Sequence, residues 1–293
     1  MNILVTGACG QLGTEMRKFA SGSNHRFIFT DVASLPGYET LSLDITDALA
    51  VERICREENV GVVVNCAAYT NVDRAEDDAA TAELLNSTAP GILAGACRDC
   101  GATFIHVSTD YVFPGNGCVP LKESDTPSPV SVYGSTKLAG EKLVQESGCN
   151  YVIIRTAWLY SPYGKNFVKT MLRLTSENDS VKVVYDQVGS PTCAADLADA
   201  VMHIIDSGKL SCKGIYHFTD EGAVSWYDFA RAIAEISGND CDVRPCLSGE
   251  FPSKVNRPHY SVLDKSLIKS TFGVEVPYWR DSLSKCIRIL TGK

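Results

Sequence analysis

The sequence lacks the long apolar run that a membrane-spanning helix needs. Such a span takes about 18 or more consecutive apolar residues, whereas the first apolar stretch here covers only Ile3–Val5. It follows Met1 and Asn2 directly, without the basic region of a secretory leader. We therefore expect a cytoplasmic protein with no membrane partner. The sequence also contains no internal repeat, low-complexity tract or charged tail.

An excess of positive charge is missing as well. The 27 Lys and Arg are outnumbered by 35 Asp and Glu, which gives a formal net charge of -8. Binding to nucleic acid or to anionic lipid starts from a basic surface, so we expect no nucleic-acid partner. The hydrophobic fraction of 45% over 293 residues is that of a globular chain with a large core.

The 12 cysteines lack the paired spacing of a disulfide framework. They are scattered over segments that we expect to form strands and helices, so we predict reduced thiols. Cys97 and Cys100 form one close pair at an expected helix end, without a second pair or a His cluster. A structural zinc ion needs four ligands, so packing is the favoured interpretation of this pair.

What the sequence does contain is a regular alternation of short β-branched runs and helical patterns. We expect strands over 2–6, 26–31, 61–67, 102–108 and 151–156, helices from Gln11, Ala48 and about Ala79, and a helix over 133–146. Such alternation predicts successive βαβ units. The strand cores are almost wholly apolar, as in strands that helices cover on both faces. The predicted fold is therefore α/β, with a doubly wound, Rossmann-like parallel sheet.

The regular pattern loosens from Leu159 to about Val184, where we expect irregular, aromatic-rich structure. Beyond it we expect helices over 194–205, 225–237 and 279–290 and a strand near 214–218. These elements suggest a smaller C-terminal part that caps the sheet and binds substrate. The predicted dinucleotide-binding domain covers residues 1–160 plus roughly 186–220, and the substrate-binding part covers roughly 161–185 and 221–293.

A glycine-rich loop follows the first expected strand and opens the first helix. Gly7, Gly10 and Gly13 stand where a side chain would block a pyrophosphate or the packing of helix on sheet. Three spaced glycines are a weak signal in a chain with 23 of them. The alternative is an ordinary strand-to-helix turn, but the position of the loop favours a dinucleotide.

Two acidic residues mark where the adenosine of that dinucleotide would lie. Asp31 ends the second expected strand, where a carboxylate would bind ribose hydroxyls, and Asp44 follows where an adenine edge could be read. The alternative for both is a surface aspartate. No Arg occurs in residues 32–35, and a carboxylate repels a 2′-phosphate. The sequence therefore favours binding of NADH over NADPH.

Tyr133 and Lys137 stand four residues apart and so share one face of an expected helix. With 12 tyrosines a chance match is common, and the alternative is a helix-start Tyr with a solvated Lys. The pair follows the fourth expected strand, and ligands bind at the carboxyl ends of parallel strands. A cation beside a phenol lowers its pKa from ~10 towards neutrality, so Tyr133 could act as a proton donor. At the end of that strand Thr109 could donate a hydrogen bond to a substrate carbonyl, unless Ser108, Thr109 and Asp110 only terminate the strand.

Together these features resemble the extended short-chain dehydrogenase/reductase family. Longer segments narrow the resemblance to its dTDP-4-dehydrorhamnose reductases, namely residues 65–76, 108–113, 133–141, 155–160, 186–192 and 257–258. The similarity runs from Met1 nearly to the C-terminus. It implies that hydride passes from NADH or NADPH to C4 of dTDP-4-dehydro-β-L-rhamnose. The product would be dTDP-β-L-rhamnose, in the last step of dTDP-L-rhamnose biosynthesis.

The resemblance also implies roles for individual residues. Tyr133 would protonate the developing alkoxide, Thr109 would bond to the same oxygen, and Lys137 would bind the cofactor ribose. Further cofactor contacts would come from Gln11, Leu12, Ile45, Ala67, Ala68, Tyr69 and Thr70. Substrate contacts would come from Asp110 at a sugar hydroxyl, Trp158 beside the sugar, and Asn166 and Arg257 at the diphosphate. Core packing is the alternative for Trp158, and a surface ion pair is the alternative for Arg257.

Three other functions are alternatives to the reductase activity. Nucleotide-sugar 4,6-dehydratases carry Glu where this chain has Tyr111, which disfavours dehydration. A 4-epimerase uses the same Tyr and Lys but keeps its NAD bound. The regulatory β subunit of methionine adenosyltransferase resembles these reductases without needing catalysis.

The resemblance also bears on whether the protein binds a metal ion and whether it forms oligomers. Glu15 lies where some relatives hold a divalent ion between subunits, but no matching acidic cluster accompanies it in the sequence. We predict no required Mg²⁺ or other metal. A homodimer is compatible with the resemblance.

Overall fold

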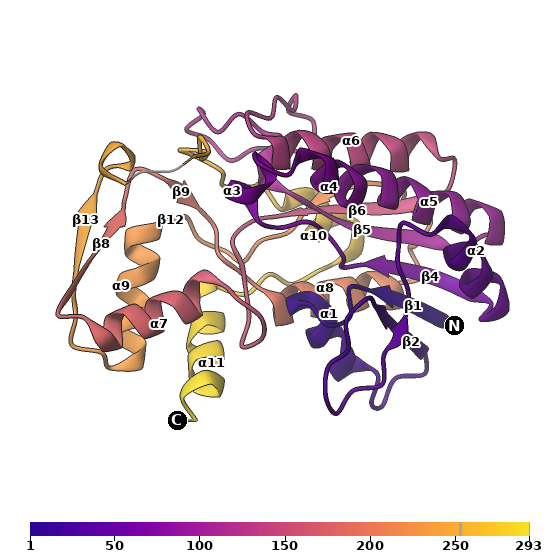
Figure 1. Ribbon diagram of the computed structural model, residues 1–293, viewed down its shortest axis with the longest axis horizontal. Helices are drawn as coiled ribbons and strands as arrows, with labels where there is room; N and C mark the ends of the chain where they lie inside the picture. Colours follow the sequence, from indigo (N-terminus) through magenta and orange to yellow (C-terminus); the bar gives the residue numbers. More distant parts are fainter. Residues whose placement is uncertain (252–253, 293) are drawn as a thin grey trace.

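A seven-stranded parallel sheet forms the centre of the protein in the computed structural model, which describes residues 1–251 and 254–292 (Figure 1). Its strands lie in the order β11 (Gly214–His217), β6 (Asn150–Thr156), β5 (Thr103–Thr109), β4 (Val60–Asn65), β1 (Asn2–Thr6), β2 (Arg26–Asp31) and β3 (Leu41–Ser42). The chain leaves β1 towards β3 and then returns to β4 on the other side. The predicted doubly wound sheet is thus confirmed, with its switch point between β1 and β4. Ligands bind at such a switch point, beyond the carboxyl ends of the strands.

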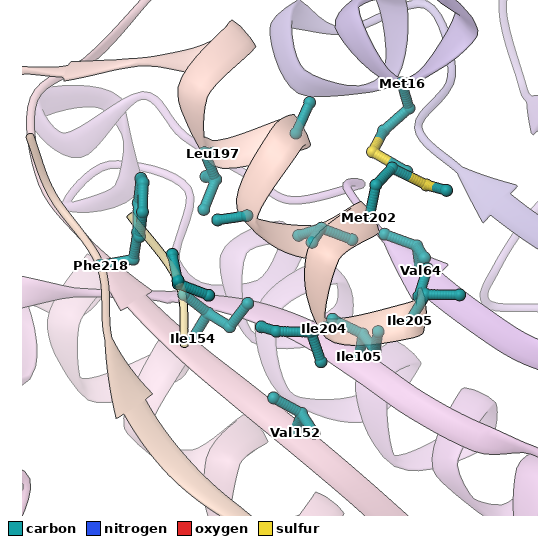
Figure 2. Packing of buried hydrophobic residues seen from close by; sticks show 14 of the residues in the cluster. Met16, Val64, Ile105, Val152, Ile154, Leu197, Met202, Ile204, Ile205 and Phe218 are labelled. Atoms are coloured by element: carbon teal, nitrogen blue, oxygen red, sulfur yellow. The ribbon is translucent and has the colours of Figure 1, made fainter. Parts of the chain in front are cut away.

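Two hydrophobic layers enclose this sheet. One face packs on α1 (Gln11–Met16), α8 (Ala194–Asp206) and α10 (Ser266–Phe272), and the other on α2 (Ala48–Glu57), α5 (Ala89–Cys100) and α6 (Val132–Glu146). Ile3 and Val5 of β1 belong to the first layer and Leu4 to the second, as the two-residue period of a strand requires. Figure 2 shows Leu197 and Met202 of α8 above the strand residues of the first layer.

A third hydrophobic core lies beside the sheet, at the side where the C-terminus ends (Figure 1). It is built from α7 (Phe167–Glu177), α9 (Trp226–Ser237), α11 (Trp279–Thr291) and a parallel pair, β8 (Ser180–Val184) with β13 (Asp242–Cys246). Two short pairs connect it to the sheet: β7 (Leu159–Tyr160) with β10 (Thr192–Cys193), and β9 (Val188–Gly189) with β12 (Val224–Ser225).

The prediction of irregular structure from Leu159 to about Val184 is wrong, because this segment contains α7 and β8. Asn166 caps α7 by accepting a hydrogen bond from the Lys169 amide, and Val168 and Met171 bury one face of the helix. An N-cap followed by apolar residues three apart is a helix signal, which the surrounding aromatic residues obscured. All 12 cysteines are free thiols, as expected.

The helix expected from Ala79 is more complex than predicted. It consists of α4 (Ala79–Glu83), a π-helical turn over Leu84–Thr88, and then α5. Two other short elements follow strand ends, α3 (Val72–Ala75) after β4 and a 3-10 turn over Asp110–Val112 after β5. Among the helices of the described residues, none has both the length and the apolar character to cross a membrane.

Candidate functional site

Tyr133 and Thr109 meet where β5 ends and α6 begins. Ser131 caps α6 by accepting a hydrogen bond from the Gly134 amide at 3.1 Å, which places Tyr133 in the first turn. A Cβ atom on Gly134 would lie 2.2 Å from the Tyr111 carbonyl oxygen, so only glycine lets the helix approach this closely. The ring of Tyr111 then packs edge-on against Tyr133, with centroids 5.5 Å apart.

The surroundings of Tyr133 keep its phenol protonated. Burial raises the pKa of Tyr133 above its ordinary value, and the charge of Asp110 and the Tyr111 phenol raise it further. A hydrogen bond with Thr109 lowers the pKa without outweighing burial. A phenol that holds its proton at neutral pH can donate it to a more basic oxygen.

Lys137 lies one helical turn beyond Tyr133 and is almost fully buried. Its Nζ donates a hydrogen bond to the Val107 carbonyl of β5 at 2.6 Å and lies 3.5 Å from His106 Nε2. Burial lowers the pKa of Lys137 to about 8, and the charge of Glu141 opposes this. Burial and the charge of Lys137 hold the pKa of His106 well below its usual range. The predicted lowering of the Tyr133 pKa by Lys137 is wrong, because burial raises this pKa and the neighbouring side chains that shift it are Thr109, Asp110 and Tyr111.

Asp110 adds a buried carboxyl group next to Thr109. Its Oδ1 accepts a hydrogen bond from Thr109 Oγ1 at 3.1 Å, and only 2% of the residue is exposed. Burial raises the pKa of Asp110 to about 6, although hydrogen bonds from Ser261 and Thr109 lower it. The group can therefore change its charge in the working range of most enzymes.

A buried ion pair that the sequence reasoning missed supports this corner of the sheet. Glu141 of α6 accepts hydrogen bonds from Arg155 of β6 at 2.9 and 2.7 Å, and from Ser108 Oγ at 2.5 Å. Both partners of the ion pair are about 2% exposed or less. The available signals were a Glu four residues after Lys137 and an Arg at the end of an apolar strand.

The glycine loop has the close packing that a dinucleotide cradle requires. Gly7 has a φ of 64°, and a Cβ atom there would lie 2.5 Å from the Ala67 nitrogen. On Gly13 a Cβ atom would lie 2.3 Å from the Gly7 carbonyl oxygen. At Gly10 it would be 3.2 Å from that same oxygen. Side chains would fill this turn, so these residues fit a nicotinamide dinucleotide whose pyrophosphate lies on the loop.

The carboxylates of Asp31 and Asp44 both accept hydrogen bonds from backbone amides. Asp31 accepts hydrogen bonds from the amides of Cys9 at 2.9 Å and Ala33 at 3.0 Å, and so ties the glycine loop to the end of β2. Asp44 accepts hydrogen bonds from the amide and the hydroxyl of Thr46 in the turn before α2. Their roles at ribose and adenine stay predictions.

Asn86, which the sequence reasoning also missed, fixes the predicted cofactor segment 67–70. Its side chain accepts a hydrogen bond from the Tyr69 amide at 2.9 Å and donates one to the Tyr69 carbonyl at 3.0 Å. It lies in the π-helical turn and also donates to Thr136 of α6 at 3.3 Å. A polar residue in the middle of an expected helix was the available signal.

Trp158 lies at the border between the sheet and the third core. Its indole stacks on Trp226 with centroids 3.5 Å apart, and a Cβ atom on Gly189 would lie 2.7 Å from it. Its φ of 49° is unusual for a large side chain. The packing alternative therefore describes part of its role, and a contact with the sugar stays a prediction.

Arg257 forms the ion pair that was the alternative for it, and its role at the diphosphate stays a prediction. It forms an ion pair with Asp73 of α3 at 2.6 Å, and its hydrogen bond with Tyr111 lowers the pKa of that phenol, which burial raises to about 12. It also lines a cleft of about 1200 Å³, together with Phe167 and Trp226. The cleft thus extends from Asp73 of α3 and Arg257 towards α7, and neither Tyr133 nor Thr109 is among its lining residues.

Asn166 is placed next to a predicted cofactor residue. Its Nδ2 donates hydrogen bonds to Gln11 Oε1 at 2.9 Å and to the Ser161 carbonyl at 2.8 Å. The first residue of α1 and the cap of α7 are therefore held together, and the proposed contact with the diphosphate stays a prediction.

Glu15 is buried in α1 and pairs with Lys18. Within residues 1–251 and 254–292, no three His, Cys, Asp or Glu side chains are grouped closely enough to hold a metal ion.

Known proteins resemble this chain along its whole length. The model of the family described as "RmlD substrate binding domain" matches residues 1–291. The dTDP-4-dehydrorhamnose reductase of Burkholderia thailandensis is 39% identical and that of Escherichia coli 37%, with at least 98% of each chain covered. A crystal structure of such a reductase from Clostridium acetobutylicum has a TM-score of 0.92 at 44% identity, covering 99% of this chain and 100% of that one. One from Bacillus anthracis, in complex with NADP, has a TM-score of 0.86 at 34% identity, covering 97% and 98%.

Proposed function

The chain belongs to the family described as "RmlD substrate binding domain". Its relatives include dTDP-4-dehydrorhamnose reductases, and we propose that the chain has the same activity. It reduces dTDP-4-dehydro-β-L-rhamnose to dTDP-β-L-rhamnose, the last step of dTDP-L-rhamnose synthesis, with NADH or NADPH as reductant. The observation that carries the proposal is the position of the Tyr133 phenol beside Thr109 at the carboxyl end of β5, where burial raises the pKa of the phenol. Reduction of a ketone needs such a proton donor for the oxygen that becomes a hydroxyl.

Three residues of the chain have distinct roles in the proposed reaction. When bound, the nicotinamide cofactor supplies the hydride. Tyr133 donates its phenol proton to the C4 oxygen, and Thr109 donates a hydrogen bond to the same oxygen as its negative charge grows. Lys137 holds the cofactor ribose with an ammonium group that β5 already orients through Val107.

The other predicted contacts recognise the substrate. Asp110 accepts a hydrogen bond from a sugar hydroxyl, and Trp158 borders the sugar. Arg257 binds the diphosphate, for which a guanidinium has a suitable geometry, and its position in the large cleft supports this role. Asn166 approaches the diphosphate from the start of α7. We keep the two-part domain division, the cytoplasmic location and a homodimer as predictions.

The deciding experiment measures oxidation of NADH and, separately, of NADPH by purified protein supplied with dTDP-4-dehydro-L-rhamnose. We expect one cofactor oxidised per sugar reduced, with many turnovers of free cofactor. A 4-epimerase would leave the free cofactor unchanged, since its hydride returns to the sugar. A regulatory subunit would bind a cofactor without oxidising it, and either result would overturn the reductase.

A further inference from the structure

A fixed arginine lies beside the carboxylate that ends β2. Arg17 stands in a 3-10 turn directly after α1. We infer that Arg17 and Thr40 form the subsite for the 2′-phosphate of NADPH. The inference rests on the proposed function only in that the ligand is a nicotinamide dinucleotide.

Hydrogen bonds and two aromatic rings hold the guanidinium of Arg17 in place. Nε donates to the Ala8 carbonyl at 3.2 Å, Nη1 to the Glu39 carbonyl at 2.9 Å, and Nη2 to Thr40 Oγ1 at 2.7 Å. The central carbon lies 4.4 Å from the centroid of the Phe29 ring and 5.1 Å from that of Tyr38. A preorganised cation loses little conformational freedom when it binds an anion.

Cys9 connects this cation to the glycine loop. Burial and the charge of Asp31 raise the pKa of the Cys9 thiol, whereas hydrogen bonds with Thr40 and Arg17 lower it, so both side chains reach the sulfur. The Cys9 amide donates to Asp31 Oδ2 at 2.9 Å. The guanidinium, the Thr40 hydroxyl and the Asp31 carboxylate therefore surround one residue of the loop. The adenosine ribose would lie at this residue, because it binds between the glycine loop and the end of β2.

The donors that remain on Arg17 suit a phosphate group. A guanidinium carries five N–H groups, and the hydrogen bonds to Ala8, Glu39 and Thr40 use three of them. One N–H remains on each terminal nitrogen, the pair that can form a forked contact with phosphate oxygens. A positive charge in this place offsets the repulsion between Asp31 and a 2′-phosphate.

The sequence favours NADH because no Arg occurs in residues 32–35 and because the Asp31 carboxylate repels a 2′-phosphate. Arg17 precedes Asp31 in the sequence and lies against β2, where its guanidinium stacks on the Phe29 ring, a contact that local sequence does not reveal. Asp31 retains its role with either cofactor, since its two oxygens order the glycine loop and Ala33 through backbone amides. The two groups together permit either cofactor to bind.

Isothermal titration with 2′,5′-ADP and with 5′-AMP tests the subsite without catalysis. We expect Arg17→Gln to weaken binding of 2′,5′-ADP about tenfold or more, because a charge-assisted contact is lost, and to change binding of 5′-AMP less than twofold. Thr40→Val keeps the cation and removes one hydroxyl, so a smaller and equally selective loss is expected. Arg26→Gln is the matched control, since Arg26 lies at the opposite end of β2 and pairs with Glu58. It should bind both nucleotides like the wild type.

Equal weakening of both nucleotides by Arg17→Gln would overturn the subsite, since it would show that the side chain only holds the loop. An unchanged affinity for 2′,5′-ADP would overturn it as well. Neither probe contains nicotinamide or the deoxyhexose substrate, so the result is independent of reductase activity. Suppose that Arg17→Gln weakens binding of 2′,5′-ADP alone and that the wild-type protein reduces no sugar nucleotide. The subsite would then be supported and the proposed function rejected.

Discussion

We expect Tyr133 to act as the proton donor because of where it lies, and the same position makes its removal informative. Its phenol lies beside Thr109 and Asp110, and loss of solvent contact raises its pKa and keeps the proton on the oxygen. We expect Tyr133→Phe to lower kcat by about 100-fold or more, the usual contribution of general acid catalysis. The KM for NADH should stay within about twofold, because the ring remains packed against Tyr111.

Steady-state kinetics of the reductase assay measure this effect. Tyr278→Phe serves as the control, because it removes a phenol that is 49% exposed. A Tyr133→Phe variant with more than a tenth of the wild-type kcat would show that another group delivers the proton.

Two buried groups near Tyr133 predict the pH dependence of kcat/KM. Lys137 has a pKa of about 8, so its ammonium is present below that pH and is lost above it. Asp110 has a pKa of about 6, so its carboxylate is present above that pH and is lost below it. If both charged forms serve the reaction, kcat/KM has a plateau from about pH 6 to 8 and falls about tenfold per pH unit on either side.

The variant Asp110→Asn separates the two limbs of this profile. It should remove the fall below about pH 6 and leave the fall above about pH 8 in place. His106 stays neutral across this range because its pKa lies well below the usual value. A profile that is flat from about pH 5 to 9 would assign neither limb to these residues.

Three of the predicted site residues have a local signal in the sequence. Tyr133 and Lys137 lie one helical turn apart, and Thr109 ends an apolar run, so spacing and position are enough to find them. Asn86 and Arg17 act through partners far along the chain, Thr136 in one case and Thr40 in the other. Those contacts exist only after folding, so no local pattern predicts them.

At the scale of elements, the Glu141–Arg155 pair joins α6 to β6 inside the protein. Removing one partner of a buried pair leaves the other charge without compensation, which typically costs about 3–5 kcal/mol. We expect Glu141→Gln to lower the free energy of unfolding by that amount, as measured by urea denaturation. A loss below about 1 kcal/mol would show that water or another group replaces the carboxylate.

A double variant tests whether charge or packing causes this loss. Glu141→Leu with Arg155→Met removes both charges and keeps apolar volume in the same place. It should recover much of the stability that Glu141→Gln loses, because apolar residues often replace a buried pair without cost. A double variant no more stable than Glu141→Gln would instead assign the effect to the lost hydrogen bonds, including the one from Ser108.

The sequence predicted elements best where one pattern extends over the whole element. β1 and β2 have the predicted bounds, and α6 and α8 differ from theirs by one residue. The two strands are apolar on both faces of the sheet, and the two helices pack apolar residues against it. The π-helical turn was missed because it depends on α6, where a Cβ atom on Gly140 would lie 2.1 Å from the Asn86 carbonyl oxygen. A contact between helices determined that irregularity.

At the scale of the whole molecule, the large cleft is formed by segments that are far apart in the sequence. Asp73 of α3, the α7 residues and Arg257 line it together. The sequence located Arg257 through resemblance alone, because nothing near it in the chain indicates a partner. Asp73 was missed for the same reason, although it forms an ion pair with Arg257 at 2.6 Å.

This pair predicts opposite effects of two substitutions on the nucleotide sugar. Arg257→Gln removes a cation that binds the diphosphate, so the KM for the sugar nucleotide should rise about tenfold or more. Asp73→Asn removes a carboxylate that competes with the diphosphate for the same guanidinium, so that KM should fall about two- to fivefold. The KM for NADH should change less than twofold in both variants, which steady-state kinetics with each substrate varied in turn would show.

The ion pair between Lys254 and Asp77 supplies the control, because it connects the same two regions and is more than 60% exposed at both ends. Exposed pairs contribute little, so Asp77→Asn should leave the KM for the sugar nucleotide unchanged. If Asp77→Asn lowers that KM as much as Asp73→Asn does, general negative charge near the cleft is the cause. If Asp73→Asn raises the KM, the carboxylate orients Arg257 for the diphosphate, and competition between the two anions is rejected.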